Sequence, residues 1–295
     1  MQKPLISIVM PAYNHERFVG PAIEGVLNQT LKDFELVIVD DGSTDGTAAV
    51  IKGYDDSRIH YHFQENQDAY NALNKGMSLA RGDYISILNS DDVYHPERLA
   101  RCLAAAKEGA EAVFTAVEPI DDAGNLIPEG THYWHVWNAR NVNHFLKTGD
   151  LYAGFLRGNL MITTSNLFMT AHAAQTTGDF ASLRYLHDYD YIFRLLLAFP
   201  GKCNFLHGEK LLKYRIHGAN TLKQGAIKAR EEDLLVIRKY MLAGLPPSAA
   251  ARAQTGLDRI LELQRELVDV RRRLRWGRWL PLVEKFIRFF GRSRA

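Results

Sequence analysis

The chain has 295 residues, of which 46% are hydrophobic and 24% charged, and a formal net charge of +2 at pH 7. This length can bury a complete α/β core and still carry a smaller accessory region, and the composition excludes a disordered or fibrous protein. A charge so close to neutral gives no reason to expect a nucleic-acid partner, and we predict none.

The first 120 residues alternate short β-branched apolar runs with helical patterns, which is typical of a parallel sheet covered by helices. The sequence predicts a doubly wound α/β fold with a mostly parallel, Rossmann-like sheet flanked by helices. We expect strands near 5–10, 35–39, 58–63, 83–88, 111–117, 160–168 and 210–215. We expect helices near 16–28, 45–53, 70–80, 96–107 and 188–199.

Beyond about residue 222 the chain is predicted to form a helical C-terminal extension. Six of its apolar residues keep a three-and-four spacing that suits a partner helix or a short coiled coil, and we expect self-association there. These residues are Leu257, Ile260, Leu263, Leu267, Val270 and Leu274.

Basic residues concentrate at the end of this extension. Residues 270–295 carry nine Lys or Arg against one acid, Glu284, a local net charge of +8 that leaves residues 1–269 at −6. Between Pro281 and Phe290 the large apolar residues fall on one helical face, with the cations away from it. Such a helix suits an anionic membrane interface, but a helix that covers the main body of the protein would show the same pattern.

Two features bear on the cellular compartment. Cys102 and Cys203 lie far apart and lack a Cys-x-x-Cys spacing, so we predict buried free thiols rather than a disulfide or a thiolate zinc site. The apolar run Leu5–Met10 is too short for a signal peptide, and no run approaches the roughly 20 residues that span a bilayer. We therefore expect a cytoplasmic protein, either free or peripheral at the inner face of the membrane.

Three predicted strands run directly into polar clusters. The first continues into Pro11–Asn14 (PAYN), the second into Asp40–Ser43 (DDGS) and the fourth into Asn89–Asp92 (NSDD). If these strands are parallel, all three clusters lie at the carboxyl edge of the sheet, where open α/β folds bind ligands. The sequence therefore predicts a binding site at this edge.

Asp91 and Asp92 are adjacent acids at the end of a predicted buried strand. Burying them is costly unless a positive group lies beside them, and a divalent cation that bridges phosphate oxygens is the usual solution. On this motif alone, a turn that caps the helix after Pro96 explains Ser90–Asp92 about equally well.

The second cluster holds another acidic pair, Asp40 and Asp41, followed by a glycine turn and by Thr44 or Asp45 as a helix cap. A carboxylate at this edge can accept hydrogen bonds from a pyrimidine imide or a ribose hydroxyl. Tyr13 can stack on a base, although a tyrosine in such a turn more often packs against protein.

Taken together, these motifs resemble family-two glycosyltransferases of the GT-A fold in their order, strand context and spacing. The residues that carry the resemblance are Pro11–Asn14, Val39–Asp45 and Asn89–Asp92. It extends through Asp68–Gly76, which is similar to a helix start in transferases that build bacterial surface polysaccharides, and it covers about residues 5–220.

The resemblance implies an inverting displacement at the anomeric carbon of a nucleotide sugar, with a UDP-sugar favoured and Mn²⁺ or Mg²⁺ as cofactor. It implies that Asp92 and His217 bind the metal, that Asp91 binds the ribose or the metal, and that Asp188 is the catalytic base. The nucleotide-sugar-binding residues that it implies are Pro11, Ala12, Tyr13, Glu16, Asp41, Asn66, Asn74, Lys75, Asp91 and Arg215.

One segment departs from the pattern of the resembled family. His187 stands where an acid usually precedes the base. Asp190 and Arg194 lie four residues apart on the same predicted helix, and we expect them to form a structural ion pair.

The predicted catalytic domain spans 1–221, with a nucleotide-sugar half at 1–117 and an acceptor half at 118–221, and the helical region with its basic end spans 222–295. The acceptor implied by the resemblance is a saccharide or a lipid-linked sugar in cell-surface polysaccharide synthesis. The aromatic and histidine-rich stretch 132–145 either lines the acceptor groove or packs in the core. Because lipid-linked acceptors are common in the family, we favour a membrane surface for the basic end.

The main alternative is a non-catalytic scaffold that binds nucleotide sugar within a polysaccharide assembly complex. The intact set Asp41, Asp91, Asp92 and Asp188 argues against it. A sugar nucleotidyltransferase is disfavoured because the first strand lacks its Gly-rich loop, and neither dinucleotide-binding nor P-loop motifs occur. His15-Glu16 is not a zinc motif either, since Val19 occupies the position of the second histidine.

Overall fold

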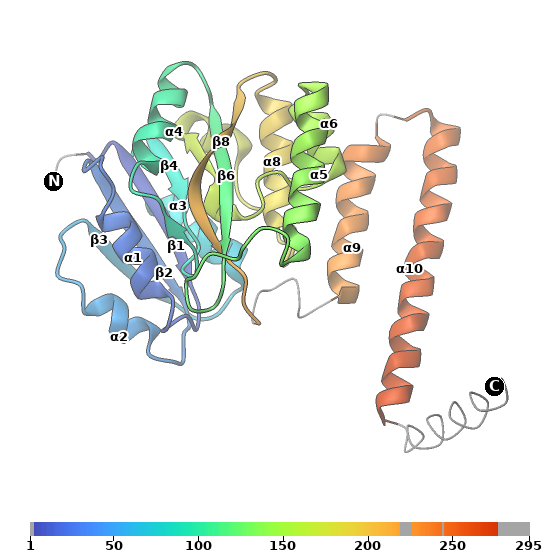
Figure 1. The fold of residues 1–295 in the computed structure, drawn as a ribbon, viewed down its shortest axis with the longest axis horizontal. Coiled ribbons are helices and arrows are strands. Elements are labelled where there is room, and N and C mark those ends of the chain that lie inside the picture. Colours follow the sequence, from blue (N-terminus) through green and yellow to red (C-terminus); the bar gives the residue numbers. More distant parts are fainter. Residues whose placement is uncertain (1–2, 219–225, 244, 277–295) are drawn as a thin grey trace. The chain divides into compact units, whose positions relative to one another are not determined.

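The chain is described by a computed structural model that covers residues 3–218, 226–243 and 245–276. It divides into two compact units, Met1–Gln224 and Gly225–Ala295. In the first unit, helices cover both faces of a curled sheet (Figure 1). The strands are β1 (Ile6–Ala12), β2 (Phe34–Asp41), β3 (Ile59–Gln64), β4 (Tyr84–Ile87), β5 (Val93–Tyr94), β6 (Ala112–Ile120), β7 (Phe168–Thr170) and β8 (Cys203–Arg215). The helices are α1 (Val19–Leu27), α2 (Thr47–Lys52), α3 (Ala69–Leu79), α4 (Arg98–Lys107), α5 (Tyr133–Thr148), α6 (Leu151–Arg157), α7 (Ala171–Thr177) and α8 (His187–Ala198).

The strands form one sheet in the order β3-β2-β1-β4-β7-β6-β8-β5. β1 pairs in parallel with both β2 and β4, and β6 pairs in parallel with β8, whereas β5 and β7 run antiparallel to their neighbours. This confirms the predicted mostly parallel sheet flanked by helices. Because β1, β2 and β4 point the same way, the polar clusters that follow them share one edge.

Successive side chains of β1 are buried on opposite faces of the sheet, as expected for a central parallel strand. Ile6, Ile8 and Met10 are fully buried in the large apolar core that also holds Val19 and Ile23 of α1. Because both faces of β1 exclude water, its sequence is a nearly continuous apolar run.

Helix α3 covers the other face and approaches the sheet through a glycine. A side-chain carbon added at Gly76 would lie 2.4 Å from Val9 Cγ1 and 3.4 Å from Val39 Cγ2. Val39 also forms a small apolar cluster with Val37 and Ala72 of α3. The close approach of α3 therefore depends on the missing side chain.

The strands and helices predicted for the first 120 residues are confirmed within a few residues at their ends. The strand predicted near 160–168 is wrong, because most of this segment is irregular and contains a short 3₁₀ helix, Thr164–Asn166, before β7. Ser165 N donates to Thr163 Oγ1, and the Asn166 amide bonds to the backbone of Thr115 on both sides. Such side-chain to backbone hydrogen bonds replace a strand ladder.

Helices α5 and α6 lie in the stretch where the sequence pattern loosens, and no helix was predicted there. Among the residues of α5 only Asn141 is fully buried, so the helix has no continuous apolar stripe to predict it. Trp134 packs in part against the large core, whereas Tyr133 is 69% exposed. Asp150 caps α6 by accepting a hydrogen bond from Ala153 N.

The second unit is helical over its described residues, as predicted. It comprises α9 (Ala226–Val236), a π-helical turn (Ile237–Leu242) and α10 (Pro247–Trp276). Of the predicted apolar stripe, Ile260 and Leu263 are 54% and 47% exposed. The side chains of Leu267, Val270 and Leu274, and residues 277–295 with the predicted membrane-facing helix, lie outside the described residues.

The two cysteines are free thiols, as predicted, but only one of them is fully buried. Cys102 is buried and Cys203 is half-buried. Among the residues described by the structure, no helix combines the length and apolarity needed to cross a bilayer.

Substitution of Gly76 tests the packing of α3. Gly76→Ala is expected to lower the free energy of unfolding by about 1–3 kcal/mol, because the new methyl group overlaps Val9. Gly208→Ala is the matched control, since a carbon added there meets nothing within 4 Å. Urea unfolding of both variants measures the effect, and wild-type stability of Gly76→Ala would contradict the close approach.

Candidate active site

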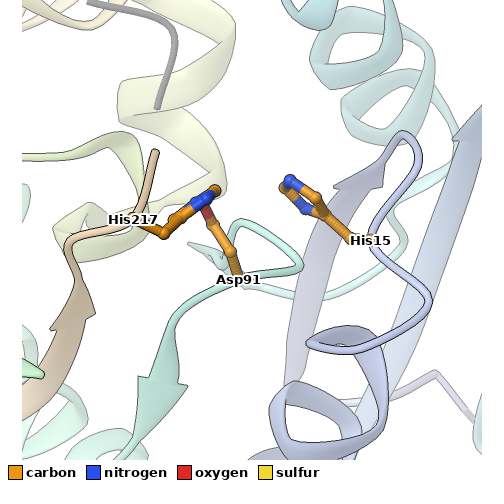
Figure 2. Close-up of side chains that lie close together, drawn as sticks. All are labelled: His15, Asp91 and His217. Atoms are coloured by element: carbon orange, nitrogen blue, oxygen red, sulfur yellow. The ribbon is translucent and has the colours of Figure 1, made fainter. Parts of the chain in front are cut away.

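Three side chains from three separate loops meet at the carboxyl edge of the sheet. His15 follows β1, Asp91 follows β4 and His217 follows β8 (Figure 2). One nitrogen of each imidazole and one carboxylate oxygen all lie within 4.8 Å of one another. Two imidazoles and a carboxylate form a donor set suited to a divalent transition metal ion.

Asp91 and His217 are in direct contact. His217 Nε2 lies 3.0 Å from Asp91 Oδ2, and the two side chains are 3% and 14% exposed, respectively. Burial alone would raise the pKa of Asp91, but the hydrogen bond with His217 and the nearby imidazoles hold that pKa below its usual value. Asp91 is therefore the ionised member of the acidic pair.

His15 is held in place through its backbone and through its ring. Its backbone N–H donates to Thr47 Oγ1 at 2.8 Å, and its Nδ1 lies 2.8 Å from Ser90 Oγ. The ring packs edge-to-face against Phe18, with the centroids 5.7 Å apart. Burial lowers the pKa of His15, so its neutral imidazole is favoured.

Asp92 is fully buried and is surrounded by hydrogen-bond donors of the protein. Its Oδ2 accepts from Ser165 Oγ at 2.5 Å and Thr163 Oγ1 at 3.2 Å, and its Oδ1 accepts from Arg215 N at 2.9 Å. Burial and the charge of neighbouring Asp91 raise the pKa of Asp92 to about 8. The two adjacent acids are thus held in opposite protonation states.

Arg215 ties the end of β8 to the loops around it. Its Nε donates to the carbonyl of Asp91 at 2.8 Å, and its Nη1 lies 3.1 Å from the carbonyls of both Asp121 and Asp122. The guanidinium also lies over the ring of Phe18, 4.9 Å from its centroid. These contacts fix the backbone that carries His217.

Asp188 reaches the same region from the start of α8. Its Oδ2 accepts from Asn159 Nδ2 at 2.9 Å, and burial raises its pKa above the usual value. The pKa of Tyr214 is also raised, first by burial and then by the charges of Asp92, Asp91 and Asp188. The three carboxyl groups therefore lie within electrostatic reach of one phenol.

The loop that holds Asp188 has an unusual backbone. Asn159 Oδ1 accepts hydrogen bonds from Met161 N and Ile162 N at 3.0 and 3.2 Å, which orients its amide nitrogen toward Asp188. Ile162 has a φ of 74°, a conformation that β-branched residues rarely adopt. Such strain persists only where the surrounding structure enforces it.

A second acidic position lies at the end of β2. Asp41 is buried, and both Gln64 Nε2 and Gln67 N donate to its Oδ1, at 2.7 and 2.9 Å. Burial raises its pKa. Next to it, Gly42 has a φ of 76° and lies so close to Asn66 that an added side-chain carbon would be 2.8 Å from Asn66 N. The structure therefore places Asp41 and Asn66 together.

The other predicted binding residues of the β1 end differ in exposure. Pro11 is half-buried and Ala12 is buried, opposite Val39 and Asp40 in the parallel ladder. Tyr13 follows them and is 47% exposed, so its ring is accessible to a ligand.

Two further predicted binding residues bond to backbone within the protein, and a third is exposed. Glu16 Oε2 accepts from Gly46 N at 2.6 Å at the start of α2. Gly46 is the N-cap residue of this helix rather than Thr44 or Asp45, although Asp45 accepts from Thr47 N in the first turn. The Asn74 amide clamps the backbone of Phe180, accepting from its N–H and donating to its carbonyl. Lys75 is exposed on α3.

Asp190 and Arg194, near the start of α8, form a structural ion pair, as expected. Arg194 Nε donates to Asp190 Oδ2 at 2.8 Å, and two further nitrogens of Arg194 donate to the carbonyls of Thr177 and Asp179. This confirms the predicted ion pair.

A pocket opens beside the histidine cluster. Its volume is about 380 Å³, and an ion pair on its lining joins Arg17 to Asp122 at 3.1 Å. The lining residues are Asn14, His15, Glu16, Arg17, Phe18, Asp45, Asp122, His217 and Gly218. The cluster is therefore reached from a space large enough for a small polar ligand group.

Comparison with known proteins identifies the family. Residues 7–168 match the family described as glycosyl transferase family 2. The chain belongs to glycosyl transferase family 2. A similar family 2 relative is the chondroitin synthase of Escherichia coli, which is 31% identical over 257 residues, or 82% of this chain. That match spans only 34% of the chondroitin synthase, so the chain corresponds to about a third of this relative's length.

Solved structures show the same GT-A fold. Residues 1–349 of TarS from S. aureus, in complex with UDP-GlcNAc, superpose with a TM-score of 0.61 and 15% identity, covering 85% of this chain and 71% of that one. The mannosyltransferase PcManGT of Pyrobaculum calidifontis, in complex with GDP-Man and Mn²⁺, gives a TM-score of 0.58 and 14% identity over 100% of this chain and 82% of its own. The predicted GT-A architecture is confirmed.

Several residues of this family 2 site carry little sequence signal. His15 directly follows the PAYN cluster, but a search for a zinc motif rejects it because the second histidine is absent. Asn159 reaches Asp188 from 29 positions away, and Ser165 reaches Asp92 from 73 positions away. These contacts depend on the fold and are not encoded in local spacing.

The raised pKa of Asp92 predicts a pH dependence of stability. The unfolded chain releases this proton near pH 4, whereas the folded chain keeps it to about pH 8, so the folded state holds more protons in between. The free energy of unfolding should therefore fall as pH rises through this window, by up to about 1.4 kcal/mol per pH unit from this group. In urea unfolding with EDTA, the stability of Asp92→Asn relative to wild type should increase from pH 5 to pH 8. A constant difference would contradict the buried, protonated state.

Proposed function

We propose that this chain is an inverting, metal-dependent glycosyltransferase that moves a sugar from a UDP-sugar to a saccharide or lipid-linked acceptor in cell-surface polysaccharide synthesis. The observation that carries the proposal is the contact of Asp91 with His217, close to Asp188, at the carboxyl edge of a family 2 fold. The E. coli relative is named chondroitin synthase and TarS binds UDP-GlcNAc, and these names support the substrate class.

The nucleotide is proposed to lie against the ends of β1 and β2. Both described hydrogen bonds to Asp41 end on Oδ1, which leaves Oδ2 to accept from a uracil imide or a ribose hydroxyl. The exposed ring of Tyr13 offers a stacking surface, and Pro11, Ala12 and Asn66 shape the surroundings. Asn74 and Glu16 then act by positioning backbone rather than by touching the donor.

A divalent metal fits the pair Asp91 and His217. Both side chains present a donor atom at the same place, and Asp91 is ionised. Asp92 was expected to bind the metal directly, but its oxygens accept from Ser165, Thr163 and Arg215, and we assign it a positioning role. When bound, the metal neutralises the departing diphosphate. An imidazole nitrogen in the donor set favours Mn²⁺ over the harder Mg²⁺.

Asp188 is proposed to take the proton from the acceptor hydroxyl. As the acceptor oxygen bonds to the anomeric carbon, the bond from that carbon to the diphosphate oxygen breaks, and the proton passes to the Asp188 carboxylate. The attacking oxygen enters opposite the leaving group, so the anomeric configuration inverts. Asn159 orients the carboxylate through its 2.9 Å hydrogen bond.

The acceptor is proposed to enter from the half of the chain at 118–221, which contributes α5, α6 and the Asn159 loop. The nucleotide-sugar half is then 1–117. A cytoplasmic location, peripheral membrane contact by the basic residues of 277–295 and self-association of the C-terminal helices remain part of the proposal.

Charge-removing variants separate the two proposed roles. Asp91→Asn is expected to abolish Mn²⁺-dependent UDP binding in calorimetry, because it removes the only carboxylate of the cluster. Asp188→Asn should retain that binding but transfer sugar about 10²- to 10⁴-fold more slowly, because it cannot accept the proton. Asp83→Asn, at an exposed ion pair with Lys3, is the control. Full transfer activity of Asp188→Asn would refute its assignment as the base.

The donor can be identified by thermal unfolding with UDP, GDP and dTDP sugars, each with and without Mn²⁺. We expect the largest metal-dependent increase in melting temperature with UDP-sugars. Larger stabilisation by GDP-sugars or dTDP-sugars would show that the donor carries a different nucleotide. Absence of binding, hydrolysis and transfer with every donor would favour the non-catalytic scaffold.

A further inference from the structure

His15 is the third member of the cluster, and neither the sequence motifs nor the proposed function gives it a role. It comes from a different loop than Asp91 and His217, yet one of its ring nitrogens belongs to the set of donor atoms within 4.8 Å (Figure 2). In the close-up its ring lies across from the Asp91–His217 pair. Contacts of both the ring and the backbone hold His15 at this position.

The hydrogen bond at one ring nitrogen of His15 leaves the other ring nitrogen able to bind a metal. His15 Nδ1 lies 2.8 Å from Ser90 Oγ, the residue directly before Asp91. When Nδ1–H donates to this hydroxyl, Nε2 carries the lone pair that a metal requires. Metal-binding histidines usually have such an outer partner, which fixes both tautomer and ring orientation.

The backbone of His15 is fixed as firmly as its ring. His15 N donates to Thr47 Oγ1, and the His15 carbonyl accepts from the backbone N–H groups of Phe18 and Val19. Phe18 packs against both imidazoles, with centroids 5.7 Å from His15 and 4.9 Å from His217. One aromatic ring therefore sets the positions of the two histidines together.

The spacing requires only a modest side-chain movement to bind one ion. Donor atoms about 2.1 Å from a metal and at right angles to each other lie about 3 Å apart, and opposite ones about 4 Å apart. The Asp91–His217 distance of 3.0 Å already meets the first value. The largest separation in the cluster is at most 4.8 Å, so His15 has to move by at most about 1.8 Å to reach the right-angle spacing.

We propose that His15 is a third protein ligand, so that the metal of this transferase is held by two imidazoles and one carboxylate. This inference rests on the proposed function, because it takes the metal at Asp91 and His217 as given. Two imidazole nitrogens shift the donor set away from the all-oxygen shell preferred by Mg²⁺. His15 therefore strengthens the preference for Mn²⁺ over Mg²⁺ that the imidazole of His217 already gives.

The experiment measures metal binding directly on the full chain. Mn²⁺ is titrated with and without saturating UDP, and free Mn²⁺ is followed by electron paramagnetic resonance. His15→Gln is expected to weaken Mn²⁺ binding at least about 10-fold while changing Mg²⁺ competition little, so that Mn²⁺/Mg²⁺ discrimination falls. His172→Gln, an exposed histidine outside the cluster, is the matched control. Melting temperatures in EDTA verify that each variant is folded.

A second measurement counts the imidazole ligands directly. Electron spin-echo modulation of Mn²⁺ bound to the wild-type chain should show couplings from two imidazole nitrogens, and His15→Gln and His217→Gln should each show one. A single coupled imidazole in the wild type, or unchanged Mn²⁺ affinity in His15→Gln while Asp91→Asn and His217→Gln lose it, overturns the role of His15 and leaves the proposed function intact. Failure of the wild type to bind Mn²⁺ even with UDP would instead overturn the proposed metal dependence itself.

Discussion

The burial of two adjacent carboxyl groups at the end of β4 is the constraint on which the rest of the site depends. The protein compensates the two groups in different ways. Asp91 stays charged beside His217, whereas Asp92 keeps its proton among the hydroxyl groups of Ser165 and Thr163. The partners lie 71 to 126 positions away in the sequence, so satisfying this one pair joins β4, β8 and the loop before β7. The contacts that compensate the two carboxyl groups therefore also hold these three parts of the chain together.

The apolar neighbour of this pair matters as much as the polar ones. Phe18 contacts both imidazoles and lies under the Arg215 guanidinium, whose centre is 4.9 Å from the ring centroid. The Phe18 ring covers one side of the charged groups, and exclusion of water from that side strengthens their mutual interactions. The position of Phe18 at the start of α1 thus couples the packing of the large core to the electrostatics of the site.

The fold was predictable where the spacing of apolar residues follows the period of a single strand or helix. Buried parallel strands and amphipathic helices in the first 120 residues are visible in the sequence, and so is the convergence of Asp41 with Asp91 at one edge. The division of labour between Asp91 and Asp92 was not predictable, because it depends on which oxygen meets which distant donor. Helix α5 was missed because it lacks an apolar stripe. The segment 160–168 was misassigned because its apolar residues flank four polar residues, 163–166, among which the side chains of Thr163 and Asn166 hydrogen-bond to backbone.

The clamp between Asn74 and Phe180 limits how relatives of this protein can diverge. The connection from α7 to α8 is fastened to α3 at that clamp and again where Arg184 Nη1 meets Asp68 Oδ1 at 3.1 Å. The ring of Phe180 also stacks on Tyr191 of α8, with the centroids 4.1 Å apart. A loop pinned at both ends cannot gain or lose residues without misplacing Asp188 at the head of α8. Changes in loop length are therefore accommodated more easily in the more exposed region around α5 and α6.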